Sequence, residues 1–189
     1  MRAQIALTRV LTKALRVLGL RDAVVRWRLH RARTRRFAAE ARGDDSLSHP
    51  ALHELDTKLD AILDRDGGFF VEAGAHDGFT QSNTYWLERF RGWRGLLVEP
   101  MPELATEARL SRPDATVVQC ALCSVAQPGA RLRMQFGDLM SNVHGAREGT
   151  WASLGTVLGW RDSYELEVSA RTLSSLLDEI DAPEVDLLS

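Results

Sequence analysis

Short apolar runs separated by helical patterns organise the chain from residue 67 onward. Three of these runs are rich in strand-forming residues, at 69–71, 95–98 and 116–118. Between the first two, Ser82 or Asn83 is suited to cap a helix that ends at Gly92. Between the second and third, residues 102–110 have the pattern of another helix. This alternation of strand and helix predicts an α/β fold with a parallel sheet covered by helices.

The pattern changes toward the C-terminus. Residues 131–136 and 165–170 alternate between apolar and polar positions, which predicts a pair of half-buried strands. A helical pattern follows over 173–180, and Val185-Asp186-Leu187-Leu188 begins one more strand. We therefore expect one α/β domain over 46–189.

The first 43 residues predict helices of a different character. Apolar residues recur at helical spacing over 5–18, Gly19 is expected to end that helix, and Asp22 to begin a second. After a polar linker at 42–45, a third helix is predicted from Ser48 or Pro50. Its expected apolar face consists of Leu52, Leu55, Leu59, Ile62 and Leu63.

Charge separates this arm from the rest of the chain. Residues 1–43 carry 12 Lys and Arg against two acids, a net charge of +10, whereas residues 44–189 carry a net charge of -12. A basic amphipathic helical arm has three readings: packing on the domain, contact with an anionic membrane surface, or binding of nucleic acid. Nucleic acid is the least expected of these, since only Trp27 and Phe37 are aromatic. No apolar run is long enough to span a bilayer and no secretory signal is evident, so we expect a cytoplasmic protein. Peripheral membrane contact through residues 1–43 stays one of the open interpretations.

One loop carries the candidate chemistry. Glu72 ends the first predicted strand, and Gly74 and Gly78 follow it four residues apart. Such a loop lies at the carboxyl edge of a parallel sheet, where ligands bind. Glu99 ends the next strand, where a carboxylate can accept hydrogen bonds from both hydroxyls of a ribose. The G-x-G-x-x-G motif of dinucleotide-binding proteins is absent, which favours a ligand with a ribose and an amino-acid tail, such as S-adenosylmethionine.

Two stretches carry a family resemblance. Phe70-Val71-Glu72-Ala73-Gly74-Ala75-His76-Asp77-Gly78-Phe79-Thr80-Gln81-Ser82-Asn83-Thr84 and Gly92-Trp93-Arg94-Gly95-Leu96-Leu97-Val98-Glu99-Pro100 resemble the FkbM-type methyltransferases. The resemblance implies a Rossmann-like class I methyltransferase sheet, preceded here by N-terminal helices. It also implies S-adenosylmethionine as methyl donor, and O-methylation of a sugar or secondary-metabolite hydroxyl on a small-molecule or glycan acceptor.

The resemblance also assigns cofactor-binding residues, and these expectations are specific to position. Carried over to this sequence, the loop residues that would line the methionine end are Glu72, Gly74, Ala75, His76 and Gly78, although His76 is equally well explained as part of the turn. The remaining cofactor-binding candidates are Asn83 at the carboxylate end, Glu99 at the ribose, Pro100 near the adenosine and Ala121 as a backbone contact to adenine. No catalytic residue is assigned.

At its C-terminal end, the sequence departs from the pattern of the family. In the family, the strand that begins at 185–189 continues into an acidic motif that supports the active site. We therefore expect a C-terminally truncated, incomplete sheet. Two alternatives stay open: a non-catalytic fragment that binds the cofactor, and an interaction protein that uses its basic arm at a membrane surface or nucleic acid.

Other candidate sites have simpler explanations. Cys120 and Cys123 lack a second pair of ligands, so structural cysteines are expected rather than a zinc site. His49 and His53 lack the H-E-x-x-H pattern, and no metal site is predicted. The four tryptophans after the arm are expected in core or loop packing: Trp86, Trp93, Trp151 and Trp160.

Overall fold

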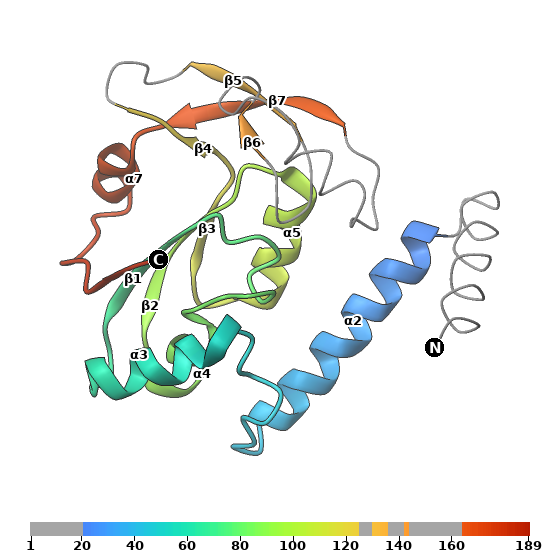
Figure 1. The fold of residues 1–189 in the computed structure, drawn as a ribbon, viewed down its shortest axis with the longest axis vertical. Helices are drawn as coiled ribbons and strands as arrows, with labels where there is room; N and C mark the ends of the chain where they lie inside the picture. The colour runs from blue at the N-terminus through green and yellow to red at the C-terminus, as the bar shows by residue number, and fades with distance from the viewer. Residues whose placement is uncertain (1–20, 125–129, 136–141, 144–163) are drawn as a thin grey trace. The chain divides into compact units, whose positions relative to one another are not determined.

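The chain divides into two units, residues 1–47 and 48–189. The computed structural model describes residues 21–124, 130–135, 142–143 and 164–189. The first predicted helix, over 5–18, and two of the tryptophans, Trp151 and Trp160, lie outside the described residues. In the first unit, helix α2 spans Arg21–Glu40 (Figure 1), which agrees with the helix expected from Asp22.

The second unit contains the predicted alternation of strands and helices (Figure 1). In chain order its elements are η1 (Leu52–Glu54), α3 (Leu55–Leu63), β1 (Phe69–Ala73), α4 (Tyr85–Arg91), β2 (Arg94–Val98), α5 (Pro102–Ser111), β3 (Thr116–Val118), β4 (Ala121–Leu122), β5 (Arg131–Gln135), β6 (Asn142–Val143), β7 (Glu165–Arg171), α7 (Leu173–Glu179) and β8 (Leu187–Leu188).

A four-stranded parallel sheet forms the centre of this unit. Its strand order is β3-β2-β1-β8, with β1 parallel to both β2 and β8, and β2 parallel to β3. Glu72 is opposite Leu97 in the register of β1 and β2. The predicted α/β fold with a parallel sheet covered by helices is therefore confirmed.

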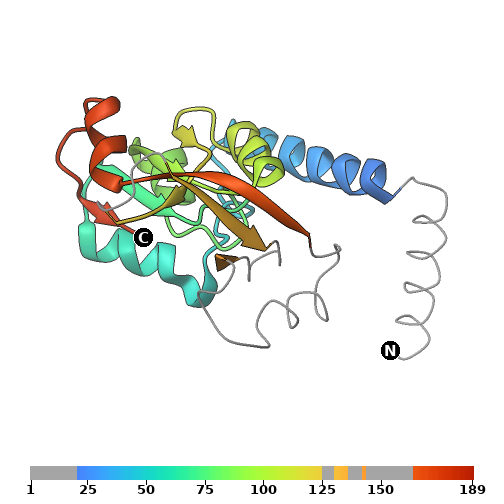
Figure 2. The same ribbon diagram turned by 90° about the horizontal axis from the view of Figure 1, so that it is seen from above.

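Alternation along the strands explains how the two faces of the sheet are covered. Phe70 and Leu97 pack with Leu87 of α4 and Ala108 of α5, and Leu63 of α3 joins them. On the opposite face, Val71 and other strand residues pack against Leu176 of α7. Figure 2 views the molecule from above, with α7 and α3 on opposite sides of the sheet. Each face therefore buries an apolar layer beneath helices, as in doubly wound sheets.

A second sheet has the order β4-β7-β5-β6. Strands β5 and β7 are antiparallel, with Leu132 opposite Val168, which confirms the predicted strand pair. Strand β4 pairs in parallel with β7 and follows β3 after two residues. Met134 and Val168 of this sheet pack with Met101 and Leu104 at the start of α5, so the two sheets belong to one unit.

For the helix predicted to start at Ser48 or Pro50, the structure shows a different first residue and a different buried face. The helix begins at Leu55, because His53 and Glu54 adopt positive φ angles of 56° and 58° that interrupt a continuous α-helix. Leu52 and Ile62 of the expected apolar face are 53% and 77% exposed. Instead Asp56 is fully buried.

A hydrogen-bonded contact accounts for the orientation of α3. Oδ2 of Asp56 lies 3.2 Å from Nδ1 of His49, whose ring stacks on Trp86 of α4. The buried face of α3 therefore runs from Asp56 to Leu63, at positions separated by three and four residues. Burying a carboxylate requires such a partner, and this requirement overrides the apolar pattern.

Candidate functional site

The loop from Gly74 to Thr84 follows β1 at the carboxyl edge of the parallel sheet. The main-chain N–H groups of Gly74 and Ala75 both donate to the carbonyl oxygen of Val98, at 2.8 and 3.1 Å. These bonds fix the first turn of the loop against the end of β2. Gly74 has a φ of +82°, and a Cβ added there would meet nothing within 4 Å. The turn thus requires a left-handed residue and leaves open space beside the backbone, as a close-approaching ligand needs.

Glu99 joins this loop to the end of β2. Its Oε2 accepts a hydrogen bond of 2.8 Å from the main-chain N–H of His76, and its Oε1 accepts one of 2.9 Å from that of Met101. The side chain is only 4% exposed, and this burial raises the pKa of Glu99, while the two N–H groups oppose the rise. Each oxygen of a carboxylate has two acceptor positions, so both oxygens retain capacity for one more hydrogen bond.

Glu72 lies in a buried hydrogen-bonded cluster. Its Oε2 accepts hydrogen bonds from the hydroxyls of Thr84 and Ser82, the latter at 2.8 Å. The same oxygen lies 3.6 Å from Nη1 of Arg112. Within the part of the chain that the structure describes, these contacts leave Oε1 of Glu72 as the oxygen that could accept from a ligand.

Arg112 is the main residue of this region that sequence patterns did not reveal. It follows the last turn of α5 and is fully buried, which is exceptional for an arginine. Its Nε donates to Oε2 of Glu88 at 2.7 Å and its Nη1 to the carbonyl oxygen of Gly78 at 3.2 Å. Its guanidinium also lies over the rings of Phe70 and Tyr85. No motif marks Arg112, because its partners come from segments 24 or more residues away.

Gly78 is packed directly against this arginine. Its φ is +75°, and a Cβ there would lie 2.9 Å from Cγ of Arg112 and 3.0 Å from Cα of Ala108. The expected tight turn at Gly78 is therefore present. The helix after it begins only at Tyr85, and Oγ of Ser82 accepts from the N–H of that residue at 3.1 Å. The N-cap residue of α4 is Thr84, so the expected cap at Ser82 or Asn83 is wrong by one or two residues, although Ser82 still supplies an acceptor to the helix start.

Asp77 organises the turn from Asp77 to Thr80, which contains Gly78. Its Oδ1 accepts from the N–H groups of Phe79 and Thr80 at 3.0 and 2.6 Å, and its Oδ2 from the hydroxyl of Thr80 at 2.8 Å. Burial raises the pKa of Asp77, but the hydrogen bond and charge of His76 and these N–H groups outweigh it. The pKa is therefore well below its usual range, and Asp77 carries a negative charge beside the loop at neutral pH.

The other expected cofactor-binding residues are spread along the same edge and beyond it. Asn83 donates from Nδ2 to Oγ of Ser189 at 2.9 Å, next to the end of β8. Pro100 is half-buried and adjoins Glu99 in sequence. The Ala75 side chain is buried in the core with Phe70, and Ala121 pairs with Ala170 in the second sheet. Their role in binding a cofactor stays a prediction.

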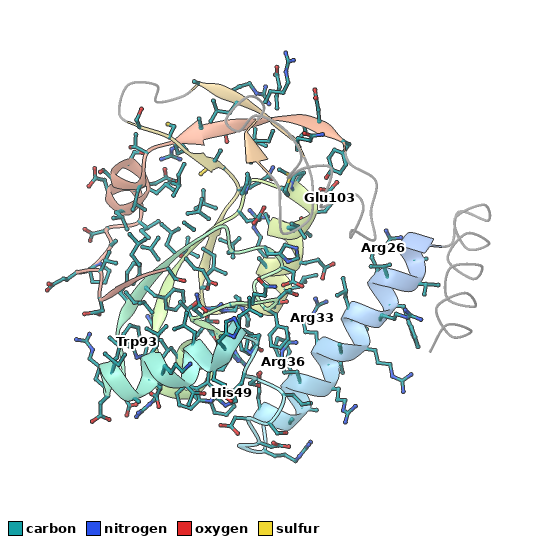
Figure 3. All side chains as sticks on the ribbon, viewed as in Figure 1. Arg26, Arg33, Arg36, His49, Trp93 and Glu103 are labelled. Carbon is teal, nitrogen blue, oxygen red and sulfur yellow. The ribbon has the colours of Figure 1, made fainter. Side chains whose placement is uncertain are left out.

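The residues considered for metals have other surroundings. Cys120 is buried in the core beneath α7, where burial raises the pKa of its thiol, and Cys123 is half-buried. Among the described residues, no group of three or more His, Cys, Asp or Glu side chains is arranged to hold a metal ion. Trp93 is 1% exposed near the start of β2 (Figure 3), and its Nε1 donates to the carbonyl oxygen of Arg65. Trp93 and the half-buried Trp86, which packs against the same core, are therefore packing residues.

Three solved structures have partial similarity to the chain. Two are S-adenosylmethionine-dependent methyltransferases in complex with S-adenosylhomocysteine, from Geobacter sulfurreducens and Thiobacillus denitrificans, at 15% and 14% identity and a TM-score of 0.31 each. In both cases the match covers 53% of this chain and 55% of the other, so the chain spans about half the length of these proteins. The third is YjhP from E. coli, at 14% identity and a TM-score of 0.29, with 77% and 70% coverage.

Family comparison gives a more direct result. No curated protein sequence matches the chain at a significant level. The model of the methyltransferase FkbM domain, however, matches residues 72–189. This range begins at Glu72, the buried glutamate next to the last residue of β1, and includes the Gly74–Thr84 loop, Glu99 and Arg112. Because the match covers more than half of the sequence and all of the parallel sheet from that glutamate onward, the chain belongs to the FkbM methyltransferase family.

Proposed function

We propose that the chain binds S-adenosylmethionine at the carboxyl ends of β1 and β2, as the donor half of an O-methyltransferase. When bound, this cofactor supplies a methyl group activated on a sulfonium. The acceptor that we propose is a hydroxyl of a sugar or secondary metabolite. The family supports methyl transfer in general, and the acceptor class rests on the resemblance alone.

The observation that carries the proposal is the setting of Glu99. Its two carboxylate oxygens are held by the main-chain N–H groups of His76 and Met101, at 2.8 and 2.9 Å. The side chain therefore has a fixed orientation, and one acceptor position remains on each oxygen. A ribose presents two neighbouring hydroxyls, which match two fixed acceptors. Pre-organised acceptors of this kind avoid the entropic cost of ordering a side chain when the ligand binds.

The surrounding residues support a ligand with a cationic tail. Asp77 is ionised at neutral pH, and the hydrogen bond and charge of His76 help to hold its pKa well below the usual range. Glu72 is a second carboxylate at the end of β1, with Oε2 engaged by Ser82 and Thr84. Along the chain, Gly74 lies between Glu72 and His76, whose N–H is bound by Glu99, and a Cβ on Gly74 would meet nothing within 4 Å. An ammonium and a sulfonium group are both favoured by such nearby negative charge.

Calorimetric titration of S-adenosylhomocysteine tests the proposal. We expect the wild-type chain to bind, and Glu99→Gln to lose about 1–3 kcal/mol of binding free energy, because an amide cannot accept on both arms. Glu167→Gln is a matched control, since Glu167 is exposed on β7. A thermal unfolding curve for each variant establishes that it is folded. Absence of binding by the folded wild-type chain would contradict the proposed cofactor site.

The alternative within the same family is a chain that binds the methyl donor but does not catalyse methyl transfer. If the chain binds S-adenosylhomocysteine but transfers no methyl group from S-adenosylmethionine to a panel of sugar and phenolic hydroxyls, it acts as a cofactor-binding fragment. Transfer to any hydroxyl of the panel would support the complete activity. Methyl transfer depends on holding donor and acceptor in line, so binding and transfer are separate requirements.

We also propose that helix α2 contacts an anionic membrane surface. Six arginines and no acid lie between Asp22 and Glu40. Trp27 is 56% exposed, and the guanidinium of Arg31 lies 5.4 Å from the centre of its ring. Arg31 and Arg35 follow Trp27 at intervals of four residues and are also exposed, so the three share one face. Arg26 and Arg33 extend the basic character along the helix (Figure 3).

The exposed aromatic residue favours a lipid surface over nucleic acid. Tryptophan prefers the interface between lipid headgroups and acyl chains, and each nearby arginine adds attraction to anionic lipid. None of the helices in the described residues is long and apolar enough to cross a membrane.

Co-sedimentation with vesicles that contain or lack phosphatidylserine tests this contact. We expect salt-sensitive binding to the anionic vesicles only, weakened in an Arg31→Gln, Arg35→Gln double variant and in Trp27→Ala. Arg133→Gln is the control, because Arg133 is an exposed arginine of the other unit. Tighter binding to a nucleic acid duplex than to the anionic vesicles would overturn the proposal.

A further inference from the structure

Arg112 holds the loop that follows β1 at three positions, Gly78, Ser82 and Thr84. Besides its bonds to Glu88 and to the carbonyl oxygen of Gly78, its Nη1 donates to Oγ of Ser82 at 3.1 Å. Its Nη2 donates to Oγ1 of Thr84 at 3.0 Å. One fully buried guanidinium thus holds the main chain at Gly78 and the two hydroxyls that precede α4.

The chemistry of these groups determines which one donates and which one accepts in each hydrogen bond. A guanidinium only donates hydrogen bonds, so the hydroxyls of Ser82 and Thr84 must accept from Arg112. Each hydroxyl has a single proton, which it donates to Oε2 of Glu72. Arg112 therefore donates to both hydroxyls, as the main-chain N–H of Tyr85 also does to Ser82, and the two hydroxyls together saturate one oxygen of Glu72. The position and orientation of the other oxygen, Oε1, follow from this arrangement.

The charges of the cluster exceed what a structural ion pair needs. Arg112 and Glu88 alone form a buried pair with a 2.7 Å hydrogen bond. Glu72 adds a second carboxylate at 3.6 Å from the same guanidinium, with its side chain 8% exposed. The cluster therefore has two carboxylates and one cation. Hydroxyls already satisfy Oε2 of Glu72, and a bound ammonium group would add a partner for Oε1 and a second positive charge.

We propose that Arg112 is the positioning residue for the amino-acid end of the methyl donor. It holds Glu72 and the Gly74–Thr84 loop so that Oε1 of Glu72 accepts from the ammonium group of S-adenosylmethionine. This inference rests on the proposed function. The adenosine end is positioned separately, because the main-chain N–H groups of His76 and Met101, rather than Arg112, hold Glu99.

Two ligands that differ only at the amino-acid end test the assignment. S-adenosylhomocysteine has the adenosine and the amino-acid tail, whereas 5′-methylthioadenosine has the adenosine and a thioether but no tail. In Arg112→Lys, which retains the charge but lacks the fork of donors, we expect the affinity for S-adenosylhomocysteine to fall by about tenfold or more. The affinity for 5′-methylthioadenosine should change by less than about twofold.

Two further variants make the pattern specific. Glu99→Gln should weaken the binding of both ligands, because Glu99 is proposed to bind the ribose that they share. Arg109→Lys is the matched control, because Arg109 lies in the last turn of α5, is exposed, and donates to the carbonyl oxygen of Val117 at 3.3 Å. Arg109→Lys should leave the affinity for both ligands unchanged.

A conservative variant keeps the test decisive if Arg112→Lys does not fold. Thr84→Val keeps the shape of the side chain but removes the hydroxyl that links Arg112 to Glu72, so the same selective loss is expected at smaller size. Equal losses for both ligands, or unchanged affinity for S-adenosylhomocysteine in both Arg112→Lys and Thr84→Val, would overturn the inference. If the wild type binds neither ligand, the proposed cofactor site itself fails.

Discussion

The main-chain nitrogen of His76 donates a 2.8 Å hydrogen bond to Oε2 of Glu99, across 23 residues of sequence. This bond joins the loop after β1 to the end of β2. The other oxygen of Glu99 accepts from Met101, the residue that precedes α5. One buried carboxylate therefore sets the spacing of the two loops between which a ribose would lie. Its ionisation state should control both the geometry of the site and its capacity to accept from a ligand.

Donor binding should weaken at acidic pH because of Glu99. Burial raises the pKa of Glu99 above its ordinary value of 4.5, against the opposing effect of the Met101 and His76 N–H groups. Only the ionised form accepts from two hydroxyls while it holds both N–H groups, so protons compete with the ligand. We expect the Kd for S-adenosylhomocysteine to increase as pH falls from 7.5 toward 5, with a midpoint above 4.5.

The matched measurement is the same pH series in Glu99→Gln. The variant should bind S-adenosylhomocysteine more weakly at neutral pH, but its Kd should lack the increase in acid that the titration of Glu99 causes. Any effect of His76 on the Kd should remain. Parallel pH profiles in the two proteins would show that another group is responsible.

Gly78→Ala should destabilise the fold more than Gly92→Ala. Both glycines have left-handed φ angles, +75° and +65°, but only at Gly78 would a Cβ collide with Arg112 and with the backbone of Ala108. At Gly92, which ends α4, nothing lies within 4 Å. We expect a loss of about 1 kcal/mol for Gly92→Ala from backbone strain alone, and about 2–4 kcal/mol for Gly78→Ala.

Urea unfolding of the two variants measures the difference. Equal losses would indicate that the contact between Gly78 and Arg112 relaxes without cost, and that the loop is less tightly packed than the distances imply.

The strands were predictable because their signal is local. In β1 and β2, strand-forming residues are buried on both faces of a parallel sheet, and short apolar runs are the direct consequence. Strand β3, at the end of the strand order, is only half-buried but has the same kind of run. The antiparallel pair of β5 and β7 was recognisable from its period-two alternation. The carboxyl edge of the sheet, and with it the region of Glu72 and Glu99, followed from the order of strands and helices.

What the sequence could not reveal depends on contacts between distant segments. The orientation of α3 follows from Asp56 and His49, a polar pair that outweighs the apolar pattern of the helix. Arg112 looks like an ordinary arginine at a helix end, and only the fold places it against Glu72, Glu88 and Gly78. Burial of a charged side chain is a property of its partners, which local patterns do not encode.

Asp77→Asn should destabilise the chain at neutral pH and much less in acid. Asparagine retains one acceptor for the N–H groups of Phe79 and Thr80 but loses the charge and the acceptor for the Thr80 hydroxyl. We expect a loss of about 1–3 kcal/mol at pH 6. The pKa of Asp77 is lowered in the folded chain, so its contribution is fully present above the ordinary value of 3.8 and is lost as pH falls below it.

The difference in unfolding free energy between wild type and Asp77→Asn should therefore be constant from pH 7 to about pH 4 and narrow toward pH 3. Because each protein is measured under identical conditions, the titration of other carboxylates largely cancels. A gap that stays constant down to pH 3 would mean that the charge of Asp77 does not stabilise the loop.

Thr172→Ala should lower the free energy of unfolding by destabilising α7, which covers one face of the sheet. Oγ1 of Thr172 accepts from the N–H of Ser175 at 3.1 Å and so caps the helix, whose Leu176 is 1% exposed and packs against Val71. Loss of such a cap costs about 1 kcal/mol, within a range of about 0.5–2 kcal/mol, because a main-chain donor at the helix start is left without its partner. Thr172→Ser keeps the oxygen and should lose much less. Urea unfolding separates the two, and equal losses would mean that the Thr172 methyl group, rather than the cap, stabilises α7 against the sheet.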